Sequence, residues 1–70
     1  MEKRGMIAEN IRALIQASGM KQKAVANKSG FGEKEFSHMM NGRKEIKAEY
    51  IPAIAKALGV TPNEIYGKAS

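Results

Sequence analysis

The stretch from residue 22 to residue 41 constrains the fold most, because two short amphipathic segments there flank a glycine. Ala26 falls where the first segment must let the second approach closely, and Gly30 falls just past its end, where a positive φ is favoured. Apolar side chains stand where they can fix the angle between two helices: Val25, Phe31, Phe36 and Met39. The pattern predicts helices over residues 22–29 and 33–40, joined by a tight turn.

A longer amphipathic helix is predicted ahead of this unit, over residues 6–18. Its apolar residues recur at the spacing of one helix face: Ile7, Ile11, Leu14 and Ile15. Gly19 can end it in the left-handed conformation. The polar residues of this helix, Glu9, Asn10 and Arg12, are expected to be solvated.

Two more helices are predicted after the central unit. A stripe of Ile51, Ile54, Ala55 and Leu58 indicates a helix over residues 48–58, with Pro52 in its first turn, where the missing N–H is harmless. The run Thr61-Pro62-Asn63-Glu64 has the pattern of a capping box, with proline at the first helical position, and predicts a short helix over residues 62–66. The fold class expected for residues 1–70 is therefore a single all-α domain of five helices.

Charge is unevenly distributed along the chain. The formal net charge is +5, and residues 20–47 hold seven basic and three acidic residues. The excess of positive charge thus lies on the central unit, as expected if that unit meets a polyanion. The alternative is a charged surface that serves only solubility.

Several functions are disfavoured by composition. The chain has no cysteine and one histidine, so we expect no disulfide, no metal site and no cofactor. No nucleophile with a base and an orienting group can be assembled, so we expect no enzyme. The charged N-terminus lacks a signal-peptide apolar run, and no segment is long enough to span a membrane. We therefore expect a soluble cytoplasmic protein.

The chain resembles the Cro and lambda-repressor-like helix-turn-helix family, also called the XRE family, over roughly residues 7–67. The matching residues are Gln22, Val25, Ala26, Gly30, Phe31, Ser37, the run Asn41-Gly42-Arg43 and the closing run Leu58-Gly59-Val60. The resemblance implies a five-helix lambda-repressor-like domain. It also implies that the helix over residues 33–40 enters the major groove of double-stranded DNA.

The resemblance places base-reading positions at the start and middle of that helix: Gly32, Glu33, Lys34, Ser37 and His38. Lys34 and His38 can donate to guanine acceptors, and Glu33 can accept from cytosine N4. Phosphate contacts are predicted at Lys21, Gln22, Lys23, Asn41, Arg43, Lys44 and Lys47. A bound phosphate would also remove the conflict between Lys21 and the positive end of the helix dipole behind it.

Two departures from the family pattern stand out. Many members bury an Arg–Glu pair where this chain has Ile15 and Met40, so both positions have become apolar together. Glu33 and Glu35 also place two carboxylates near the expected groove, where phosphate repels a carboxylate that has no cytosine partner.

The function expected from these observations is a sequence-specific transcriptional regulator of the phage, prophage or bacterial Cro and repressor type. A homodimer through the C-terminal helix region is possible by analogy with the family. The alternative is a protein-interaction module, such as an antitoxin or anti-repressor, and the two glutamates favour it. Both a complete regulator and the N-terminal domain of a larger one are compatible with this sequence.

Overall fold

The computed structural model describes residues 3–67 and contains only helices and loops over that range. The elements are α1 (Lys3–Ser18), α2 (Gln22–Ser29), α3 (Glu33–Met40), the 3₁₀ turn η1 (Ala48–Tyr50), α4 (Ile51–Leu58) and α5 (Pro62–Tyr66). The bounds of α2, α3 and α5 coincide with the expected ranges. The five-helix, all-α fold class is confirmed.

Helix α1 begins at Lys3, three residues before the expected start. The sequence pattern located its beginning at the first apolar residues, Met6 and Ile7. Lys3, Arg4 and Gly5 add a turn of helix without adding an apolar position, so hydrophobic periodicity cannot reveal it.

The single helix expected over residues 48–58 is wrong at its start. Ala48–Tyr50 form a 3₁₀ turn, in which the Tyr50 N–H donates to the Lys47 carbonyl at 2.9 Å and the Ile51 N–H donates to the Ala48 carbonyl. In a continuous α-helix the Ala48 carbonyl would need the N–H of residue 52, which is a proline. The tighter turn satisfies that carbonyl instead, and the α-helix begins after it.

The turn between α2 and α3 has the geometry that its glycine predicts. Gly30 has φ 89° and ψ 16°, and the Phe31 N–H donates back to the Ala26 carbonyl at 2.9 Å. This is a Schellman termination, which redirects the chain within two residues. The capping box at Thr61 and Glu64 is also present, with the Thr61 N–H 2.9 Å from Oε2 of Glu64.

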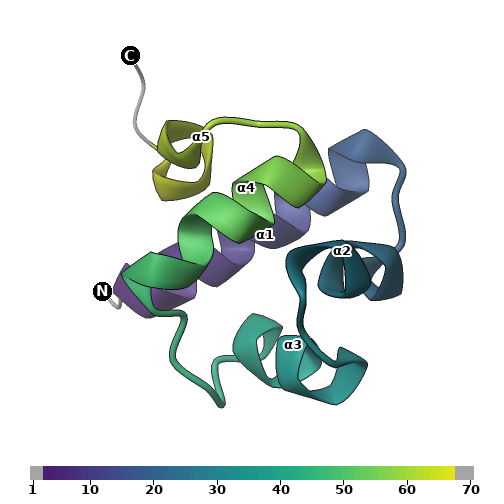
Figure 1. The fold of residues 1–70 in the computed structure, drawn as a ribbon. Coiled ribbons are helices and arrows are strands. Elements are labelled where there is room, and N and C mark those ends of the chain that lie inside the picture. Colours follow the sequence, from purple (N-terminus) through teal and green to yellow (C-terminus); the bar gives the residue numbers. More distant parts are fainter. Residues whose placement is uncertain (1–2, 68–70) are drawn as a thin grey trace.

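The helices enclose one hydrophobic core. Figure 1 shows α4 in front of α1, with α5 above this pair and α2 and α3 on the opposite side of it. The core is formed by Ala8, Ile11, Ile15, Val25, Ala26, Phe36, Met39, Met40, Ile46, Ile51, Ile54, Ala55, Leu58 and Ile65. Ile46 was not expected there, because it lies in the basic loop between α3 and η1. It is 7% exposed and ties that loop to the body of the domain.

Two polar residues of α1 are not simply solvated, contrary to expectation. The side-chain amide of Asn10 donates to the Ile65 carbonyl at 2.9 Å, and the Arg12 guanidinium donates to the Met40 carbonyl at 3.4 Å. Both acceptors lie in the last turn of a helix, where backbone carbonyls lack intrahelical donors. Asn10 thus fastens the end of α5 to α1, and Arg12 does the same for α3.

Candidate nucleic-acid interface

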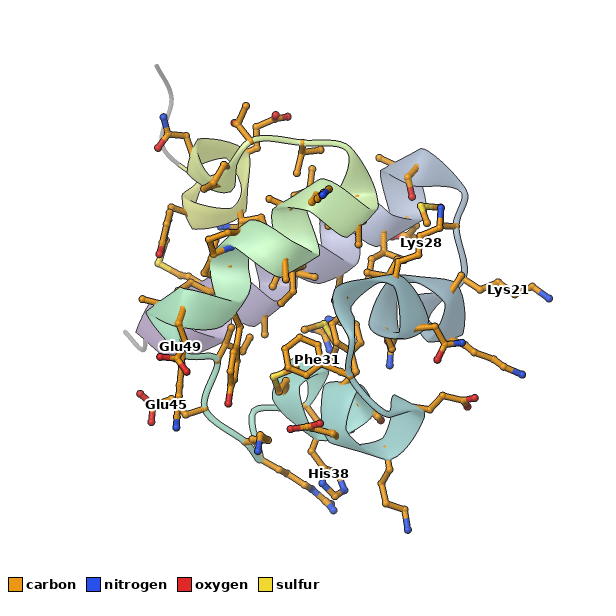
Figure 2. The ribbon with its side chains drawn as sticks, in the orientation of Figure 1. Lys21, Lys28, Phe31, His38, Glu45 and Glu49 are labelled. Carbon is orange, nitrogen blue, oxygen red and sulfur yellow. The ribbon has the colours of Figure 1, made fainter. Side chains whose placement is uncertain are left out.

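Helix α3 has two opposite faces. Phe36 and Met39 are fully buried and Met40 is 3% exposed, so these three side chains hold the helix on the core. On the other side Lys34 is exposed, while Ser37 and His38 are half-buried. Figure 2 shows His38 directed away from the body of the domain. We call Lys34, Ser37 and His38 the α3 ridge, and its outward orientation is the one that the sequence predicts.

An aromatic group fixes how α3 sits against its neighbours. The Phe31 ring lies with its centroid 6.2 Å from that of Phe36 and 5.0 Å from that of Tyr50, edge-on to the latter at 73°. Phe31 occupies the turn before α3, and its ring lies between α3 and the η1–α4 region (Figure 2). These three rings come from the turn, from α3 and from η1. Their packing therefore sets the position of α3 relative to α4.

The α3 ridge borders a shallow, open hollow of about 550 Å³. Its lining residues are Glu33, Lys34, Ser37, His38, Asn41 and Arg43. Arg43 reaches this place because α3 ends in a second Schellman turn. Gly42 has φ 79°, and the Arg43 N–H donates to the His38 carbonyl at 2.8 Å. Four of the five predicted base-reading residues thus lie together with two predicted phosphate-binding residues.

The start of α2 forms the second part of the site. Lys21 is the N-cap residue and makes no side-chain capping hydrogen bond, and its side chain projects from the end of α2 in Figure 2. Lys21 and Lys23 line a second hollow with Ala24 and Asn27. Asn27 was not among the predicted site residues. Its spacing of four from Lys23 on an exposed helix face is the signal that could have identified it.

The remaining predicted residues are exposed and line neither hollow. Gly32 is the N-cap of α3, with φ −70° and ψ 155°, and Gln22 is the first residue of α2. Lys47 is the N-cap of η1. Lys44 lies 3.2 Å from Glu35, measured from Nζ to Oε2, and Lys23 lies 3.8 Å from Glu33 between the same atoms.

A metal site finds no support over the part of the chain that the structure describes, because no group of three or more His, Cys, Asp or Glu side chains is placed to bind an ion. Among the same residues no helix is both long enough and apolar enough to cross a membrane.

The arrangement of α2, the turn and α3 is that of a helix-turn-helix domain. The family described as "Helix-turn-helix domain" matches residues 7–65, and the chain belongs to this family. The resemblance inferred from the sequence is thereby confirmed. A comparison with curated protein sequences finds no match.

Two solved structures have the same fold. The clp gene regulator ClgR from C. glutamicum superposes with a TM-score of 0.86 at 22% sequence identity, covering 93% of this chain and 84% of that one. The restriction-modification controller protein C.AhdI from Aeromonas hydrophila superposes with a TM-score of 0.82 at 24% identity, covering 89% of this chain and 94% of that one.

Proposed function

We propose that this protein binds double-stranded DNA sequence-specifically and regulates transcription, with α3 in the major groove. The observation that carries the proposal is the α3 ridge, which faces outward between two groups of cations while the opposite face of α3 is buried in the core. A helix presented in this way fits the width of the major groove. Both structural neighbours bear the names of regulators or controllers, which supports the same role.

The ridge supplies the side chains for base reading. Lys34 donates to guanine O6 and N7, and His38 donates to an acceptor such as N7. Ser37 can pair with either kind of base edge, and Glu33 accepts from cytosine N4. Gly32 adds no side chain, so the backbone before α3 can approach the DNA closely.

Phosphate contacts hold the register on either side of the ridge. Lys21, Gln22 and Lys23 act at the start of α2, where unpaired N–H groups and the helix dipole favour an anion. On the other side the contacts come from Asn41, Arg43, Lys44 and Lys47. Such contacts position the protein without carrying sequence information.

A homodimer would place two α3 helices in successive major grooves, about 34 Å apart, on a near-palindromic site. The C-terminal region around α5 is the proposed contact between the two copies. Tyr66 at its end is 38% exposed, more than is usual for an aromatic side chain in a core. The proposed setting is the cytoplasm of a bacterium or of a cell infected by a phage.

The alternative, a protein-interaction module, drew its support from Glu33 and Glu35. In the structure each of these carboxylates lies beside a lysine, so the two do not form a separate acidic surface. This arrangement favours the DNA-binding role over the alternative.

Selection of bound oligonucleotides from a random duplex pool tests the proposal. We expect an enriched motif with two half-sites about one helical turn apart. Binding to random duplex DNA should also weaken with salt, at a log–log slope of about 0.9 per phosphate contact. The double variant Lys34→Ala with His38→Ala is the control, because it should keep the salt dependence and lose the motif. Salt-independent binding with no enriched motif would overturn the proposal in favour of a protein partner.

A further inference from the structure

Two ion pairs frame the α3 ridge. The Lys44 ammonium lies 3.2 Å from the Glu35 carboxylate, and both side chains are about two-fifths exposed, at 41% and 40%. The Lys23 ammonium lies 3.8 Å from the Glu33 carboxylate, with side chains 68% and 59% exposed. Each lysine is a proposed phosphate contact, and each carboxylate belongs to α3.

The pairs lie on opposite sides of the helix. Residues two apart in an α-helix are separated by about 200° around its axis, so Glu33 and Glu35 point to opposite flanks with Lys34 between them. One pair joins α3 to the start of α2, and the other joins α3 to the loop after it. A DNA backbone would run along each flank of the ridge. On each flank the positive charge of the lysine is therefore partly neutralised by a glutamate of the protein itself.

We propose that Glu35, and more weakly Glu33, restrain DNA affinity by occupying the lysines that phosphates must engage. The inference rests on the proposed function and adds to it two residues that set the affinity for DNA. A carboxylate and a phosphate diester are both oxygen anions, so each glutamate competes with DNA for the same ammonium group. The lysine exchanges one partner for the other as the domain docks.

Exposed ion pairs are weak, so the exchange can occur whenever a phosphate is held in place by other contacts. Non-specific binding depends almost wholly on phosphate neutralisation, so a competing carboxylate weakens nearly its only source of affinity. A specific complex gains base contacts in addition. The two glutamates thus lower the affinity for duplex DNA in general, and non-specific binding, which has no base contacts to offset the loss, becomes negligible first.

A purely structural role for these glutamates makes a different prediction. Both lie in the first turn of α3, where acidic side chains favour the helix dipole. If that were their only role, replacing them would lower the stability of the fold and change the salt dependence of DNA binding no more than the loss of any other exposed negative charge. The salt dependence therefore separates the two roles.

The test compares Glu35→Gln with Glu49→Gln on random duplex DNA over a salt series. Glu49 belongs to η1, outside the site, and its replacement makes the same change in net charge (Figure 2). For Glu35→Gln we expect the log–log salt slope to steepen by up to about 0.9, the value of one additional phosphate contact. If the variant and the wild type bind equally at 1 M salt, the variant then binds up to about eightfold more tightly at 0.1 M. Glu33→Gln should follow with a smaller change, and Glu49→Gln should change the slope by less than half as much.

A double variant shows whether the effect of Glu35→Gln on the salt slope depends on Lys44. In a Lys44→Gln background, Glu35→Gln should change the slope no more than Glu49→Gln does, because the competition has been removed. The proposal is overturned if Glu35→Gln behaves like Glu49→Gln, or if its effect persists without Lys44. Failure of the proposed function would look different, since the wild type itself would then show no salt-dependent binding to duplex DNA.

Discussion

The two faces of α3 divide stability from recognition within eight residues. The inner face buries Phe36 and Met39 completely, whereas the outer face exposes Lys34 and leaves His38 half-buried. The inner face packs against α1 and α2, so exchange of its side chains is costly. The outer side chains contact little of the protein, so they can change without affecting the fold. Such a helix can acquire a new DNA preference while its position stays the same.

Among the variants on the two faces of α3, replacement of Phe36 should produce the largest effect, a loss of stability. Phe36→Ala removes a fully buried ring that also stacks near Phe31, and we expect a loss of about 3–5 kcal/mol in the free energy of unfolding. A core of this size rarely supplies more than about 3–5 kcal/mol, so the variant should be largely unfolded at 25 °C. Circular dichroism at 222 nm measures this directly. A cooperative melt near that of the wild type would show that the ring is not part of the framework.

A buried charge on the inner face is expected to cost nearly as much. Ile15 is 7% exposed, so Ile15→Arg places an unpaired charge in the core and should destabilise the fold by about 3–5 kcal/mol. Adding Met40→Glu should recover part of the loss, because it recreates the ion pair that many family members bury there. The contact of Arg12 with the Met40 carbonyl places this part of α1 beside the end of α3.

Urea unfolding of both single variants and the double variant gives the coupling energy. Additive losses would mean that Ile15 and Met40 are not neighbours.

On the outer face, Lys34→Ala should change recognition and leave stability alone. We expect the preference at one base pair to fall by about 1–3 kcal/mol, because a bidentate contact to guanine is lost. The free energy of unfolding should stay within about 0.5 kcal/mol of the wild type, since Lys34 is exposed. Competition binding with single-base-pair variants of the selected site measures the first quantity. An equal loss on every sequence would place Lys34 at a phosphate instead.

Arg43→Ala should give the smallest effect and the least sequence-dependent one. Arg43 lies beside the ridge but beyond the end of α3, where we propose a phosphate contact. Binding to all duplexes should weaken alike, with the log–log salt slope reduced by about 0.9. Salt titrations on a specific and a random duplex provide the measurement, with Lys56→Ala on α4 as a matched control for the loss of one positive charge. If the loss of affinity depended on one base pair only, Arg43 would be a base-reading residue and not a phosphate contact.

The sequence alone determined those features of the fold that depend only on residues close together in the chain. The bounds of α2, α3 and α5 followed from periodicity and capping residues, and the turn followed from Gly30, whose φ is 89°. The inward face of α3 followed from the 100° spacing of Phe36, Met39 and Met40. These features are local because a helix repeats every 3.6 residues and a positive φ is a property of a single residue.

Only the tertiary structure decided which distant residues meet. The bond from Asn10 to the Ile65 carbonyl spans 55 positions, and the one from Arg12 to the Met40 carbonyl spans 28. The burial of Ile46 and the pairing of Glu35 with Lys44 likewise depend on how the loop after α3 folds back. No periodic pattern encodes such contacts, because they arise only when separate helices have packed and their side chains share one surface. The charged residues around the ridge can therefore be identified from the sequence, but which of them form ion pairs depends on the folded domain.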